Sequence, residues 1–175
     1  DIHRHPEIGF EEERTSEIVA SYLTELGIDV HRGLGGTGVV GILRRGDSDN
    51  RSVALRADMD ALEIFELNTF DHKSLYDSKM HACGHDGHTT MLLGAAEYLS
   101  QHGKFSGTVY FIFQPAEEGL GGADAMIKGG LFDLFPSDAI YGMHNAPKLP
   151  VGTFAISPGH RMASFDQLDV VIQGV

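Results

Sequence analysis

A short stretch near the middle of the chain concentrates residues that bind transition metals. Residues 80–88 read Met-His-Ala-Cys-Gly-His-Asp-Gly-His, which places one thiol and three imidazoles close together. Thiolate and imidazole are the usual ligands of zinc-like ions, and the glycine between Cys83 and His85 lets both side chains face one centre. A lone cysteine or histidine is more often a buried or satisfied residue. The cluster as a whole favours Cys83 and His85 as metal ligands, whereas His81 and His88 are equally well explained as supporting or exposed residues.

Two adjacent carboxylates, Glu117 and Glu118, follow a nearly continuous apolar run at residues 108–113. Paired acids repel each other, so a buried pair needs a cation or two separate tasks. Adjacent side chains on an extended backbone point to opposite sides, so one acid could bind a metal while the other serves as a general base. A solvated acidic loop is the alternative, and it is disfavoured because the preceding run is typical of a strand buried on both faces.

Two further apolar runs end in polar side chains. His144 follows residues 139–143 and offers another imidazole, and Asp58 and Asp60 follow residues 52–57. These carboxylates could orient a ligand histidine or bind a metal. A single acid after a strand is often only a helix cap, so the spacing of these two residues is the weaker indication.

The elements that must position these residues alternate along the chain. The patterning predicts helices at 11–26, 86–101 and 122–128, and strands at 28–32, 39–43, 52–57, 108–113, 139–143 and 153–157. This order predicts an α/β fold with a mixed sheet and helices on both faces. Open sheets of this type bind ligands beyond the carboxyl ends of their strands, so the polar residues above are expected at one edge. The glycine-rich residues 33–38 match a dinucleotide fingerprint, but a strand rather than a helix follows them, which favours a hairpin.

The composition excludes several classes of protein. The 175 residues are 42% hydrophobic and 22% charged, as in an ordinary globular domain. The 25 acidic and 13 basic residues give a formal charge of -12, which argues against nucleic-acid binding. No apolar run reaches the roughly 18 residues of a membrane span. The single cysteine and the lack of a leader after Asp1 favour the cytoplasm, and the strand-like residues 168–175 at the end of the chain suggest a truncated protein.

Four motifs together resemble those of the M20 metallopeptidase family, in the branch of amidohydrolases that act on N-acyl amino acids, such as hippurate and auxin-conjugate hydrolases. These motifs are Arg56–Leu62, Met80–Thr89, Gln114–Gly119 and Met143–Asn145, and His3–Glu7 with Phe10–Glu12 resemble the N-terminal signature of the same branch. The resemblance implies a three-layer α/β/α, zinc-peptidase-like fold that is truncated. Residues 1–164 would be the N-terminal part of the catalytic domain, and residues 165–175 the first strand of a lid or dimerisation domain.

The same resemblance implies roles for individual residues. Two divalent ions (zinc, manganese, nickel or cobalt) would be held by Cys83, His85, Glu118 and His144, with Cys83 bridging. Glu117 would be the general base in metal-assisted hydrolysis of a small N-acyl amino acid, and Asp58 the acid that supports a ligand. The family has one further ligand histidine in a region absent here, so the fragment could be inactive, and the full-length protein is expected to be a homo-oligomer. A non-catalytic metal-binding module and a purely structural domain remain the alternatives.

Overall fold

The computed structural model describes residues 1–47, 51–160 and 168–174. The chain divides into two units, Asp1–Asn145 and Ala146–Val175. All of the helices and strands described lie in the first unit. In chain order they are α1 (Glu13–Glu25), β1 (Asp29–Leu34), β2 (Gly38–Arg45), β3 (Ser52–Asp58), α2 (His85–His102), β4 (Gly107–Gln114), α3 (Gly122–Lys128), α4 (Leu131–Leu134) and β5 (Ala139–Gly142).

The strands form one mixed sheet in the order β1-β2-β4-β3-β5. β4, β3 and β5 run parallel to one another, whereas β2 is antiparallel to both β1 and β4. The glycine-rich residues 33–38 make the β1–β2 turn, where Gly35 and Gly36 adopt positive φ angles of 66° and 94°. A hairpin at this position was predicted, and it is confirmed.

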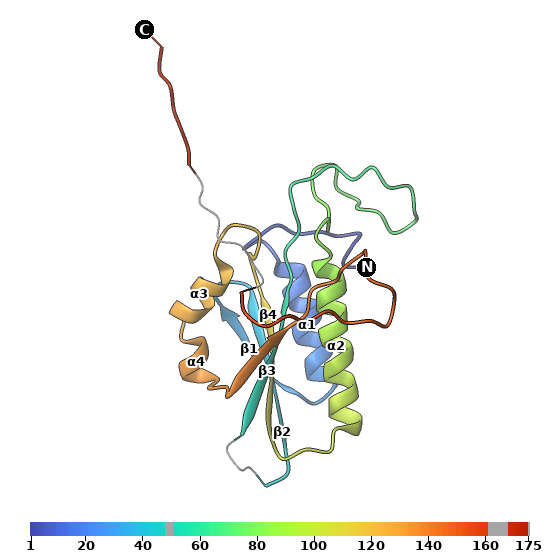
Figure 1. Ribbon diagram of the computed structural model, residues 1–175, viewed down its shortest axis with the longest axis vertical. Helices are drawn as coiled ribbons and strands as arrows, with labels where there is room; N and C mark the ends of the chain where they lie inside the picture. Colours follow the sequence, from blue (N-terminus) through green and yellow to red (C-terminus); the bar gives the residue numbers. More distant parts are fainter. Residues whose placement is uncertain (48–50, 161–167, 175) are drawn as a thin grey trace. The chain divides into compact units, whose positions relative to one another are not determined.

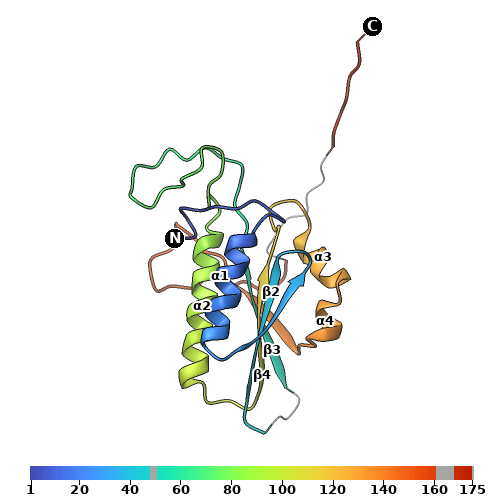
Figure 2. The same cartoon turned by 180° about the vertical axis from the view of Figure 1, so that it is seen from behind.

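Helices cover both faces of this sheet. α1 and α2 lie on one face, and α3 and α4 lie on the other (Figures 1 and 2). The side chains of β4 enter both hydrophobic cores of the sheet. Phe111 and Phe113 belong to the core beneath α1 and α2, whereas Tyr110 and Ile112 belong to the opposite core with Met126 of α3. Successive side chains of a strand point to opposite faces, so a continuous apolar run needs two covers. The predicted three-layer α/β/α arrangement is therefore confirmed.

Two local predictions differ from the structure. Residues 153–157 form no strand, and Phe154 is 82% exposed. An alternating pattern alone does not make a strand, because its backbone groups need a neighbouring strand. The described residues of Ala146–Val175 form no strand, so none offers such a neighbour. The short helix α4 was not predicted, since four residues are too few to show helical periodicity.

The end of the chain was predicted to be a strand at residues 165–175. Residues 168–174 have no strand structure, and residues 165–167 and 175 lie outside the described ranges. The division into two domains at residue 164 stays a prediction. None of the helices in the described residues combines the length and the apolar composition that crossing a membrane requires.

Candidate metal centre

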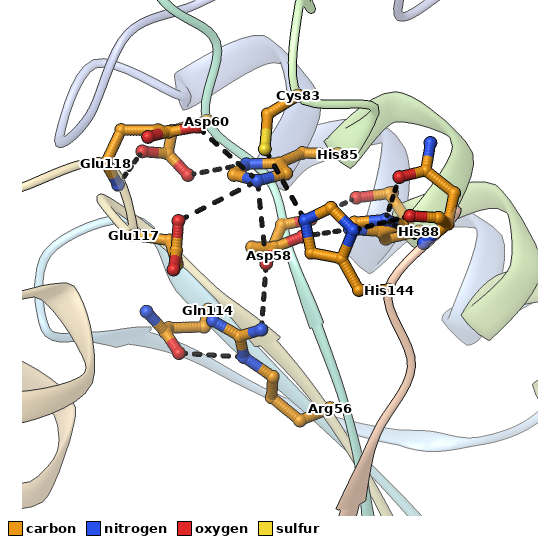
Figure 3. A network of polar contacts seen from close by, with 12 residues as sticks. Arg56, Asp58, Asp60, Cys83, His85, His88, Gln114, Glu117, Glu118 and His144 are labelled. Carbon is orange, nitrogen blue, oxygen red and sulfur yellow. Dashed lines mark hydrogen bonds and ion pairs between the residues drawn. The ribbon is translucent and has the colours of Figure 1, made fainter. Parts of the chain in front are cut away.

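The predicted site residues lie at one edge of the sheet, where three parallel strands end. Asp58 is the last residue of β3, Glu117 and Glu118 follow β4, and His144 follows β5. The first residue of α2, His85, lies at the same edge (Figure 3). Parallel strands carry their carboxyl ends to a common edge, so the prediction that these loops converge is confirmed.

The Cys83–His85 loop packs against the loop that carries His144. Gly84, between the two candidate ligands, has a φ of 88°, which only glycine adopts without strain. A Cβ atom at Gly84 would overlap the side-chain amide of Asn145. The glycine therefore allows both the bend of the chain and the close approach of the two loops.

His85 lies at the centre of the cluster and is fully buried (Figure 3). Its Nε2 atom lies 3.7 Å from Glu118 Oε1 and 3.8 Å from Glu117 Oε2. The ligand atoms of Cys83, His85 and His144 lie within 4.8 Å of one another, and so do those of His85, Glu117 and Glu118. The four predicted ligands and Glu117 thus form two overlapping groups that share His85, and Asp58 and His88 form a third group with the same histidine.

The tautomers of the two histidines suit metal binding. His85 Nδ1 lies 3.1 Å from Asp60 Oδ1 and donates to it, so the neutral ring that binds a metal has its lone pair on Nε2. His144 Nδ1 donates to the carbonyl oxygen of Asn145 at 2.8 Å, which leaves its Nε2 lone pair 3.4 Å from Cys83 Sγ. In both rings the nitrogen without a proton faces the cluster.

Two buried polar atoms of the cluster are better explained by a bound cation than by their contacts within the protein. His85 Nε2 and Glu118 Oε1 are buried, and neither has a hydrogen-bond partner among the described residues. Buried polar atoms are nearly always satisfied, so an unsatisfied facing pair needs an explanation. Two ligands of one tetrahedral ion, each about 2.1 Å from it, lie about 3.4 Å apart, close to the separation here. The donor set of sulfur, nitrogen and carboxylate oxygen suits a transition-metal ion.

The electrostatics of the cluster also favour a cation. Burial, the hydrogen bond to Glu118 and the charges of Glu117 and Asp58 raise the pKa of Cys83 to about 12. Burial alone would lower the pKa of His85, but Asp60, Asp58 and Glu118 raise it above its ordinary value. The nearby acids contribute to both shifts, because they leave a local excess of negative charge. A dication would remove that excess and favour the thiolate.

The two acids after β3 have different partners. Asp58 accepts hydrogen bonds from Arg56 Nη1 at 2.8 Å and from His88 Nδ1 at 2.6 Å. Asp60 accepts from His85 Nδ1, and also from the backbone N–H of Glu118 at 2.9 Å. Burial would raise the pKa of Asp58, but His88 and Arg56 lower it to about 2. The hydrogen bond to the predicted ligand His85 is thus made by Asp60, which the residue pattern had indicated together with Asp58, whereas the family resemblance had implied this role for Asp58.

His88 acts as a support in this arrangement. The backbone N–H of Asn145 donates to His88 Nε2 at 3.0 Å, so the ring proton is on Nδ1 and is donated to Asp58. The ring of His88 also contacts that of His144, with centroids 4.5 Å apart. His81 is buried, and neither of its ring nitrogens has a hydrogen-bond partner in the described part of the chain.

The sequence of this chain is similar to those of known proteins. The model of "Peptidase family M20/M25/M40" matches residues 54–173. A hippurate hydrolase of Campylobacter jejuni is 49% identical over 173 residues, which are 99% of this chain and 45% of that protein. An Arabidopsis thaliana protein named IAA-amino acid hydrolase ILR1-like 2 is 47% identical over 174 residues, which are 99% of this chain and 39% of that protein.

Among solved structures, the Bacillus subtilis YXEP protein is described as a dinuclear metal binding peptidase from the M20 family. It superimposes with a TM-score of 0.81 and 42% sequence identity, over 87% of this chain and 42% of that one. The chain therefore spans less than half the length of these relatives.

Proposed function

The chain belongs to peptidase family M20/M25/M40, and on that premise we propose that it is the N-terminal, metal-binding part of a hydrolase that cleaves the amide bond of N-acyl amino acids. The observation that carries the proposal is the unsatisfied His85 Nε2, which faces the carboxylates of Glu117 and Glu118. The relatives named above act on hippurate and on IAA-amino acids, both of which are N-acyl amino acids. Residues 1–164 would belong to the catalytic domain, and residues 165–175 would begin a second domain.

Cys83, His85, Glu118 and His144 would hold two divalent ions of the zinc, manganese, nickel or cobalt type. When bound, such ions supply Lewis acidity toward an amide carbonyl. Asp60 fixes the His85 ring through Nδ1 and receives the backbone N–H of Glu118, so one carboxylate orients two of the ligands. Asp58 is connected to the His144 loop through His88 and Asn145.

Glu117 would be the general base. Its side chain is 34% exposed and thus reachable by water, while Oε2 stays 3.8 Å from His85 Nε2. A carboxylate at this position can accept the proton of an attacking water and return it to the leaving amine. Adjacent Glu118 takes the ligand role because its Oε1 is buried and unsatisfied.

A cytoplasmic location suits a thiol ligand, since Cys83 must stay reduced to bind an ion. The substrate would be a small molecule, and the full-length protein would form a homo-oligomer.

The test replaces Glu117 in the full-length protein. We expect Glu117→Gln to retain its bound metal, measured by elemental analysis, and to lose about 10²- to 10⁴-fold in the turnover of hippurate. Glu25→Gln makes the same chemical change on an exposed residue of α1 and is expected to match the wild type. Unchanged turnover in Glu117→Gln would reject the assigned base. Bound metal without hydrolysis of any N-acyl amino acid by the wild type would favour the second candidate, a non-catalytic metal-binding module.

A further inference from the structure

Glu12 is a fully buried carboxylate outside the metal centre. Its Oε1 atom accepts the backbone N–H of Ala116 at 2.8 Å, and its Oε2 atom accepts the hydroxyl of Thr37 at 2.5 Å. Both donors are neutral, and burial raises the pKa of Glu12. Burying an acid beside neutral donors is costly, so the position calls for a reason beyond packing.

The residue that Glu12 holds is strained. Ala116 is fully buried and has a φ of 49°, in the left-handed region that residues with a side chain rarely adopt. The surroundings fix this conformation from several sides, because Gly122 N–H donates to the carbonyl of Ala116 at 2.9 Å. A Cβ atom on Gly9 would lie only 3.0 Å from Ala116 Cα. Strain of this kind persists only where the structure around it enforces it, and it occurs often at functional sites.

Ala116 directly precedes the two acids of the metal centre. Ala116 lies in the loop that follows β4, and the side chains of Glu117 and Glu118 lie close to His85 (Figure 3). If Ala116 relaxed to a negative φ, both carboxylates would change direction together, because they follow the strained residue in the chain.

We propose that Glu12 is a positioning residue, whose buried carboxylate holds the Ala116 N–H and so keeps the turn that aims Glu117 and Glu118 at His85. The inference rests on the proposed function, in which these two acids are the base and a ligand. It also gives a role to Glu12 of the Phe10–Glu12 motif, which contains none of the predicted site residues. A role in stabilising α1 alone belongs to the neighbouring Glu7, whose carboxylate accepts hydrogen bonds from the backbone N–H groups of Arg14 and Thr15.

Amide hydrogen exchange of the metal-free chain tests whether Glu12 holds the turn. The quantity measured is the ratio of the exchange rate of the Ala116 amide to that of the Phe111 amide in β4. In Glu12→Leu we expect this ratio to rise about tenfold, which is the change that the loss of one buried hydrogen bond produces. Glu7→Leu is the matched control and should leave this ratio unchanged. Glu12→Gln keeps an acceptor oxygen and should restore most of the protection. An unchanged ratio in Glu12→Leu would overturn the proposal.

Thr37→Val is the second variant, for the case that Glu12→Leu does not fold. It removes only the hydroxyl that holds Oε2, and a rise of about threefold in the same exchange ratio is expected. No rise would count against the proposal.

Cobalt binding tests whether the turn serves the metal centre. We expect Co²⁺ to bind Glu12→Leu about tenfold more weakly than Glu7→Leu, because the loosened turn no longer presents Glu118. Equal Co²⁺ affinity in the two variants would overturn the positioning role. A wild-type chain that binds no Co²⁺ would refute the proposed function, whereas the exchange ratio of Ala116 would still decide whether Glu12 holds the turn.

Discussion

The pKa of Cys83 leads to a measurable prediction about the metal-free protein. Its value of about 12 lies well above the ordinary 9.0, so at pH 8 the thiolate fraction is about 10³-fold below that of an ordinary thiol. A thiolate of higher pKa is intrinsically more reactive, with a Brønsted slope of about 0.4 to 0.5, which restores a factor of about 16 to 32. Alkylation of Cys83 at pH 8 should therefore be about 30- to 60-fold slower than in the unfolded chain.

The assay is alkylation by iodoacetamide, followed by mass spectrometry, after the metal has been removed with a chelator. Cys83 is the single cysteine, so every adduct on a cysteine-containing peptide that maps to a thiol reports on it. The rate is measured from pH 7 to pH 10 in the folded chain and in urea. In the folded chain the rate should still rise about tenfold per unit above pH 9, where the unfolded chain levels off. Poor access of the reagent alone would slow the reaction without moving this plateau.

Glu118→Gln separates the contribution of charge from that of burial. Removing the charge of the Glu118 carboxylate should lower the thiol pKa and speed alkylation, whereas Glu25→Gln on α1 should change neither. A plateau at or below pH 9 in the folded wild type would refute the reasoning.

Metal binding by the same thiol must release its proton. The affinity for Co²⁺ should therefore rise about tenfold per pH unit between pH 7 and pH 9, and Cys83→Ser should flatten this dependence. An affinity that does not change with pH would show that Cys83 is no ligand.

Two further predictions concern the stability of the metal-free chain. The pKa of the buried Asp58 carboxyl is lowered from 3.8 to about 2. Its charged form therefore adds about 2 kcal/mol to the free energy of unfolding above pH 4, and this contribution is lost as the pH falls toward 2. Urea unfolding at pH 6 and pH 2.5 measures the loss, and Asp58→Asn should lack it; equal pH dependence in both chains would contradict the assignment. Gly94→Ala in α2 should raise the free energy of unfolding by about 0.5 to 1 kcal/mol, since its Cβ would meet nothing within 4 Å. Gly35→Ala should lower the free energy of unfolding by about 1 to 3 kcal/mol, because the φ at this position is 66° and the new Cβ would lie 2.8 Å from Met126 Cγ. Thermal melts in which Gly94→Ala lowers the stability and Gly35→Ala raises it would contradict both predictions.

Much of the fold could be predicted because its patterns are local. The run of β4 is apolar at successive positions, which is typical of a strand covered on both faces, and the two cores confirm it. The glycines at residues 33–38 predicted a turn because left-handed backbone favours glycine. Residues 153–157 show where local patterns fail, since their alternation predicted a strand that finds no partner among the described residues of its unit.

The candidate site was likewise predicted only in part from the sequence. The types and spacing of Cys83, His85, Glu117 and Glu118 predicted a metal centre, because few other chemistries need a thiol, imidazoles and paired acids together. The sequence did not show that Asp60, rather than Asp58, bonds to His85, because the choice depends on how α2 approaches the end of β3.

The sequence by itself determined the chemistry that is available here: the donor atoms, the strands that carry them and the edge of the sheet where they converge. Only the tertiary structure decided which acid orients which histidine and which buried carboxylate holds the turn before Glu117. The reason is distance along the chain, since Glu12 and Ala116 are 104 positions apart and only long-range packing brings the acid to its donor. Hydrogen bonds depend on distance and angle within a fraction of an ångström, and residue order alone does not specify either.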